Sequence, residues 1–119
     1  MGRDGRMILL EEPLFGQIIR AEANLLDDGI HVLITGGERT HVGAVSAAEP
    51  GKETETMTFP GHKDHFVSGP WAKALAEVLN ARAVVACGIH YDRASEAQIR
   101  QILRVTDGML RGLFDQLGG

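Results

Sequence analysis

The chain has 119 residues, a formal net charge of −4 at neutral pH and one cysteine. At this length we expect a single domain over residues 1–119 that buries about two-thirds of its unfolded surface. The negative charge, without a clustered basic face, argues against nucleic-acid binding. One cysteine excludes an internal disulfide and a cysteine-based zinc site, and it favours a reducing compartment. Because neither an apolar run of about 18 residues nor a signal-peptide pattern is present, we expect a cytoplasmic protein without a membrane span.

The first half of the chain alternates between apolar and polar residues with the period of two that is typical of β-strands. The alternation is clearest from Ile19 to Leu25, where one face is apolar and the other polar. Residues 1–6 are polar and glycine-containing, and we expect them to be disordered. Strands are expected at residues 7–10, 16–25, 30–35, 42–48 and 53–59. The small side chains of residues 42–48 favour a helix packed closely on that strand, and room for a ligand is the alternative.

A helix and a further strand are expected next. From Trp71 onward, apolar residues recur at intervals of three and four, which indicates a helix with one buried face. Ser68 is the expected N-cap, because Pro70 is tolerated only in a first helical turn; an earlier start at Asp64 is the alternative. Residues 83–89 form an apolar run without polar alternation, which predicts a strand buried on both faces, with Cys87 as a core residue.

The last predicted helix runs from about residue 95 to residue 117. Ser95 and Gln98 have the spacing of a capping box, which marks its start. Gly108 and Gly112 each cost about 1 kcal/mol in a helix relative to alanine, so we expect another backbone to approach there. That backbone would belong either to a second copy of the chain, in a homodimer, or to the first helix, and we favour the homodimer.

These elements predict a fold class. With the short run at residues 7–10 left aside, the order is β-β-β-β-α-β-α. We therefore expect a single two-layer α+β domain, an antiparallel β-meander with two helices packed on one face.

Three polar loops at the ends of regular elements hold four of the five histidines, at residues 36–41, 61–65 and 90–92. One interpretation is a metal site, in which His62 and His65 would join a third histidine and a carboxylate. The His-x-x-His spacing is not diagnostic of metal binding, and solvated loop histidines explain it as well. A second interpretation is acid–base chemistry by a histidine beside Asp64 or Asp92. No nucleophile elbow, Walker loop or dinucleotide fingerprint accompanies it, so the residues do not support an enzyme.

Anion binding is the third interpretation of these loops. The glycine pair at residues 36–37 exposes backbone N–H groups, and Arg39 can hold a phosphate through two hydrogen bonds. Lys63 precedes a predicted helix N-terminus, where anions bind favourably. Together these features suggest a ligand that carries a phosphate.

The three loops also carry a family resemblance. The motifs in question read T-G-G-E-R-T-H-V-G-A-V (35–45), P-G-H-K-D (60–64) and V-V-A-C-G-I-H-Y-D-R-A-S (84–95). In this order they resemble the LpdD-like prenylated-flavin chaperone domains, small helpers of UbiD-type decarboxylases, over residues 15–114. The resemblance implies a non-enzymatic chaperone that binds prenylated flavin mononucleotide (FMN) and assists maturation of the decarboxylase. It also implies a fold related to proteasome-assembly chaperones.

The resemblance carries its site over residue by residue, as cofactor-binding positions without catalytic or metal-binding residues. The positions are Gly36, Gly37, Glu38, Arg39, His41 and Gly43 in the first motif, Gly61, His62 and Lys63 in the second, and Gly88, His90 and Asp92 in the third. Within this set, Arg39 and Lys63 suit the flavin phosphate, and His41, His62 or His90 suits the polar edge of the flavin ring. The motif also implies an uninterrupted helix after the second loop, and we expect Ser68-Gly69-Pro70 to interrupt that helix in this chain.

Two hypotheses of other classes stay open beside this one. The chain could be a protein-only assembly chaperone whose loops bind a partner chain, or a small histidine-dependent enzyme. A single pocket formed by the three loops is expected under the flavin hypothesis. Arg104, on the last helix and far from all three loops in the sequence, is expected to take no part in it.

Overall fold

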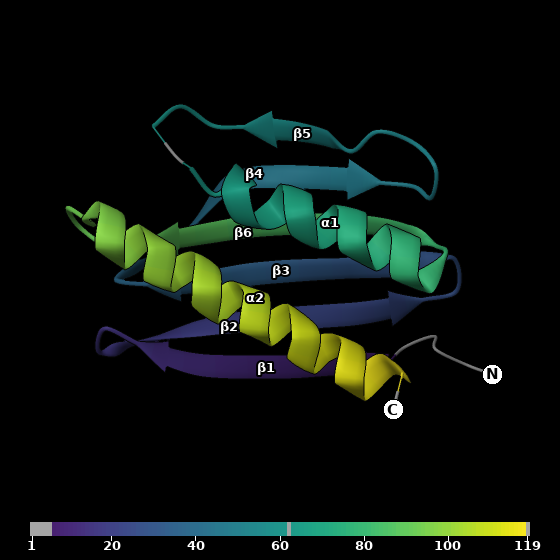
Figure 1. Cartoon of the computed structure of the whole chain (residues 1–119), viewed down its shortest axis with the longest axis horizontal. Helices are drawn as coiled ribbons and strands as arrows, with labels where there is room; N and C mark the ends of the chain where they lie inside the picture. The colour runs from purple at the N-terminus through teal and green to yellow at the C-terminus, as the bar shows by residue number, and fades with distance from the viewer. Residues whose placement is uncertain (1–5, 62, 119) are drawn as a thin grey trace.

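The computed structural model describes residues 6–61 and 63–118. Its strands are β1 (Arg6–Leu14), β2 (Gln17–Leu26), β3 (Gly29–Gly37), β4 (Arg39–Ala48), β5 (Glu55–Thr58) and β6 (Arg82–His90), and its helices are α1 (His65–Leu79) and α2 (Glu96–Gly118). The strands form one six-stranded sheet in the order β1-β2-β3-β6-β4-β5. Both helices lie on the same face of this sheet (Figure 1). The predicted α+β class, with two helices on one face, is confirmed.

The connectivity of the sheet differs from the predicted antiparallel meander. Strands β1, β2 and β3 do form a meander, but β6 inserts between β3 and β4. It pairs parallel with β3 and antiparallel with β4, so the sheet is mixed. Because α1 carries the chain back across the sheet after β5, the last strand can reach a central position. Apolar alternation identifies a strand's faces and does not identify its neighbours, so the sequence pattern could not show this insertion.

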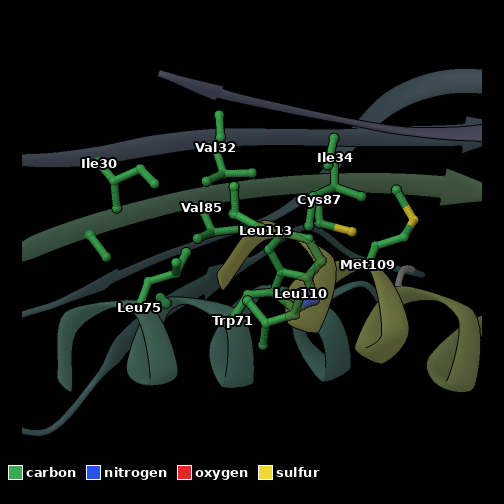
Figure 2. Close-up of a cluster of buried hydrophobic side chains, with 14 of the residues drawn as sticks. Ile30, Val32, Ile34, Trp71, Leu75, Val85, Cys87, Met109, Leu110 and Leu113 are labelled. Atoms are coloured by element: carbon green, nitrogen blue, oxygen red, sulfur yellow. The ribbon is translucent and has the colours of Figure 1, made fainter. Parts of the chain in front are cut away.

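The helix-facing side of the sheet forms the core. From β3 and β6 it contains Val32, Ile34, Val85 and Cys87, all fully buried. Trp71 and Leu75 of α1 and Leu110 and Leu113 of α2 pack over them (Figure 2). Cys87 is therefore a core residue, as predicted.

The other side of the sheet is only partly buried. Val84 of β6 is 38% exposed, so the prediction that residues 83–89 are buried on both faces is wrong. Since both helices cover one face, every second residue of β6 points away from them. Large exposed apolar side chains also lie on β1, β2 and β5, and they are Met7, Leu9, Ile18, Leu26 and Met57.

The first strand is longer than predicted. β1 begins at Arg6, inside the segment expected to be disordered, and residues 1–5 lie outside the described part of the chain. It continues through Pro13 to Leu14, because an edge strand does not need a donor on its outer side. Glu11 lies opposite Arg20 on β2 and forms an ion pair with it at 2.6 Å, which explains why acidic residues continue the strand.

Helix α1 begins three residues earlier than the predicted cap. Its N-cap is Asp64, so the alternative start is confirmed. The expected interruption at Ser68-Gly69-Pro70 is wrong, because the helix continues through Pro70. Ser68 does not cap the helix because its hydroxyl is buried and lies 2.8 Å from the hydroxyl of Ser46 on β4. The Ser46 hydroxyl is in turn 2.7 Å from the Thr56 hydroxyl on β5. The small residues of β4 thus lie under a closely packed helix, which confirms the packing interpretation of that strand.

Helix α2 starts at the predicted capping box. The Ser95 N–H donates to Gln98 Oε1 at 2.8 Å, and the Gln98 N–H donates to Ser95 Oγ at 3.1 Å. The glycines do not contact another element, because a Cβ at Gly112 would meet no atom of the described chain within 4 Å and one at Gly108 would meet only the Arg111 side chain. The predicted contact with the first helix is wrong at these positions, and the homodimer stays a prediction. Neither described helix is long and apolar enough to span a membrane.

Candidate functional site

Asp64 joins three elements at one end of the sheet. Its carboxylate is 7% exposed and makes no hydrogen bond to its own helix. Oδ1 accepts the Ile89 N–H of β6 at 2.9 Å, and Oδ2 lies 3.1 Å from His41 Nε2 on β4. The Cys87 thiol donates to Oδ1 at 3.7 Å. The loop before α1 is therefore fixed to the two strands beneath it by a buried acid.

Two glycines of the family motifs make room for this arrangement. A Cβ on Gly43 would collide with the Asp64 carboxylate, and a Cβ on Gly88 would collide with the backbone carbonyl of His41. Only glycine lets the chains approach so closely. In the structure, Gly43 and Gly88 accommodate the Asp64–His41 pair.

The first and third loops are also bound to each other. The Glu38 N–H donates to the His90 carbonyl at 2.7 Å, and the Asp92 N–H donates to Glu38 Oε1 at 2.6 Å. His90 Nε2 lies 2.7 Å from Asp92 Oδ1, and the His41 and His90 rings meet edge to face with centroids 5.8 Å apart. The predicted convergence of these two loops thus rests on direct hydrogen bonds.

Tyr91 connects the third loop to the end of β1, the edge strand of the sheet. Its hydroxyl donates to the Leu14 carbonyl at 2.7 Å, and its ring packs edge to face against Phe15. The pKa of Tyr91 is raised, first by burial and then by the negative charge of Glu38. The pKa of the Cys87 thiol is raised well above its usual value, mainly by burial and then by Asp64. Cys87 is therefore a protonated, unreactive thiol.

A cavity of about 220 Å³ opens beside these residues. Its lining includes polar residues, Lys63, Asp64, His90 and Tyr91, and apolar residues, Ile89, Ile99, Ile102 and Leu103. Phe66, which is 53% exposed, stands at this cavity. The lining thus offers contacts both to a polar or anionic group and to an apolar one.

A groove of about 490 Å³ adjoins the cavity and is lined by residues of α1 and α2. Phe66, Val67 and Leu103 line both hollows. Arg104 lines the groove, so its distance from the loops in sequence does not put it far from the site in space. This groove could not be predicted from the sequence, because helical periodicity does not show which faces of two helices meet.

The predicted site residues fall into several groups. Gly61, Lys63 and His90 line the cavity, whereas Glu38, His41 and Asp92 hold the loops together. Gly36 and Gly37 end β3 opposite Ile89 and His90, and Gly43 and Gly88 lie under the Asp64–His41 pair. Arg39 is exposed and pairs with His90 in the β4–β6 register, outside the cavity lining. His62 lies outside the described residues.

Two further points concern the chemistry of the site. Asp64 was not among the predicted ligand-binding residues, and its central position follows from tertiary contacts that spacing along the chain does not reveal. Within residues 6–61 and 63–118, no three His, Cys, Asp or Glu side chains are grouped so that they could hold a metal ion.

Comparison with known proteins gives three similarities. Residues 15–118 match the family model described as the prenylated flavin chaperone LpdD-like domain. The chain is 28% identical over 107 residues to Protein LpdD of Lactiplantibacillus plantarum (strain ATCC BAA-793 / NCIMB 8826 / WCFS1), covering 86% of this chain and 79% of that protein. In fold it is similar to a chain of a chaperone complex for yeast 20S proteasome assembly, with a TM-score of 0.55 and 14% identity. That similarity covers 94% of this chain and 97% of the other.

Proposed function

Since this chain belongs to the family of prenylated flavin chaperone LpdD-like domains, we propose that it is a non-enzymatic chaperone in the cytoplasm. Its ligand is prenylated FMN, bound transiently, and its partner is a UbiD-type decarboxylase whose maturation it assists. The observation that carries this proposal is the cavity at the end of the sheet, which combines a lysine and a histidine with apolar lining residues.

The phosphate is expected at Lys63. This lysine lines the cavity and lies just before the N-terminus of α1, whose first turn contains no acidic side chain. A helix N-terminus and an adjacent cation both favour a phosphate. The nearby Asp64 carboxylate opposes the anion less than a free carboxylate would, because the Ile89 N–H and His41 already bind it. Arg39 of β4 lies opposite His90 of β6. We propose it as a second cation, which approaches the phosphate from outside the cavity.

A homodimer is also part of the proposal. The uncovered face of the sheet carries exposed Met7 and Leu9 on β1, Val84 on β6 and Met57 on β5, and exposed apolar side chains that share one face favour an interface. A two-fold pair would bury the same residues of both copies. This face now supports the dimer better than Gly112 does, since it presents large apolar side chains rather than open space.

Absorption and fluorescence titration with reduced and with oxidised prenylated FMN tests the ligand. We expect saturable binding of at least one redox form, and we expect the loaded protein to raise the activity of the purified apo-decarboxylase above that obtained with free cofactor. Arg39→Ala should weaken binding about tenfold if this guanidinium grips the phosphate, and Arg39→Lys should restore part of it. Equal affinity for the wild type and Arg39→Ala would remove the phosphate role from Arg39.

The same titration distinguishes a flavin-binding chaperone from a protein-only chaperone. That alternative is favoured by the exposed apolar sheet face, which could bind a partner chain without any small molecule. Activation of the decarboxylase without flavin binding by this chain would support it. Turnover of a substrate by the isolated chain would instead support an enzyme.

A further inference from the structure

We propose that the groove between α1 and α2 holds the ring system of the ligand while its phosphate occupies the cavity at Lys63. This inference rests on the proposed flavin function and adds where the ligand lies. The flavin ring then lies on a surface formed by two helices and not among the polar loops.

Size is the first reason. The cavity measures about 220 Å³, which is smaller than the roughly 300–1,000 Å³ of most small-molecule sites. The adjoining groove measures about 490 Å³. Because Phe66, Val67 and Leu103 belong to both linings, the two hollows meet along these side chains. A ligand with a small anionic end and a large flat end therefore fits the two together.

The lining of the groove is the second reason. Phe66, Pro70, Trp71 and Leu110 provide an apolar surface, and Phe66 is an exposed aromatic ring against which a flat ring system can stack. Its neighbour His65 lies against it, with ring centroids 4.3 Å apart, so the phenyl ring is supported from one side.

Polar groups in the groove suit the edges of a flavin, which carry carbonyl oxygens and ring nitrogens that accept hydrogen bonds. Arg100 and Arg104 are exposed donors that line the groove. Among the described residues of its lining, Asp107 is the one carboxylate, and it forms an ion pair with Arg111. The groove thus presents donors and positive charge to an anionic ligand.

The test compares binding of prenylated FMN to variants of the full chain, followed by the fluorescence of Trp71, the one tryptophan. Phe66→Ala should weaken binding roughly tenfold, the size of one aromatic stacking contact, and Phe66→Tyr should stay near the wild type. Val78→Ala, at another exposed apolar position of α1, is the matched control and should change nothing. Arg104→Ala should weaken binding about threefold to fivefold, while Lys73→Ala should not.

A second ligand separates the two ends of the site. Ribose 5-phosphate carries the anionic end without the ring. Its inhibition constant in competition with prenylated FMN should be unchanged by Phe66→Ala but raised by Lys63→Ala. If Phe66→Ala and Arg104→Ala bind prenylated FMN as tightly as the wild type, the groove assignment is overturned while the flavin function stands. If the wild type binds no prenylated FMN, the proposed function fails and this inference fails with it.

Discussion

Replacing Asp64 with alanine tests whether this buried acid holds the site together. The substitution removes the acceptor for the Ile89 N–H and the partner of His41 Nε2. A hydrogen bond to a charged group contributes about 1.5–3 kcal/mol, and leaving a buried donor unsatisfied costs about 1–3 kcal/mol. Removing the cost of burying the carboxylate offsets part of this loss. We therefore expect Asp64→Ala to lower the free energy of unfolding by about 2–4 kcal/mol.

Thermal unfolding followed by circular dichroism measures this change. For a chain of this size each 1 kcal/mol shifts Tm by about 3–6 °C, so Asp64→Ala should lower Tm by on the order of 10 °C. Asp64→Asn should lower it less, because the amide oxygen can still accept the Ile89 N–H. Asp115→Ala, at an exposed position of α2, is the control and should shift Tm by no more than about 2 °C.

A Tm for Asp64→Ala within about 2 °C of the wild type would refute the reasoning. It would mean that the loop before α1 is held by α1 packing alone.

Three further outcomes follow from the same structure. Because folding raises the pKa of Cys87 above its usual 9.0, the thiol of the unfolded chain ionises first as pH rises. The free energy of unfolding, measured by urea titration, should therefore fall above about pH 9. A Cys87→Ala variant should show a smaller decline. Gly88→Ala should destabilise the fold by about 1–3 kcal/mol or more through collision with His41, whereas Gly112→Ala, with open space at its Cβ, should raise stability by up to about 1 kcal/mol. A Tm for Gly88→Ala at or above that of the wild type would contradict the close-approach argument. If the uncovered sheet face forms the dimer, Val84→Glu should give a folded monomer by light scattering, and an unchanged dimer would place the interface elsewhere.

Much of the fold could be predicted from local patterns. Residues close in sequence determine three of its features: the alternation of β2, the capping box of Ser95 and Gln98, and the apolar stripe around Trp71. For the start of α1, local patterns left a choice between Ser68 and Asp64. They favoured the wrong one, because Ser68 is a good cap by type but its hydroxyl is occupied by Ser46 from another strand.

The candidate site shows the same division between local and tertiary information. The motifs identified the loops, and the hydrogen bonds of Glu38 and Asp92 bring the first and third together. The central position of Asp64 and the groove beside Arg104 depend on how α1 and α2 lie on the sheet. Distance along the sequence is a poor guide to distance from the site, since Arg104 shares the groove with Phe66.

The insertion of β6 between β3 and β4 constrains the order in which the chain can fold. During synthesis, the first five strands leave the ribosome before the strand that separates β3 from β4, so both inner edges stay unpaired until residues 82–90 emerge. Unpaired edges of apolar strands are prone to pair with other chains. The sheet can close only after α1 has brought β6 back, so its long-range pairings form late and are slow to nucleate. A nascent chain that stalls before residue 82 would present two open strand edges, which makes this interval the time when aggregation competes most strongly with folding.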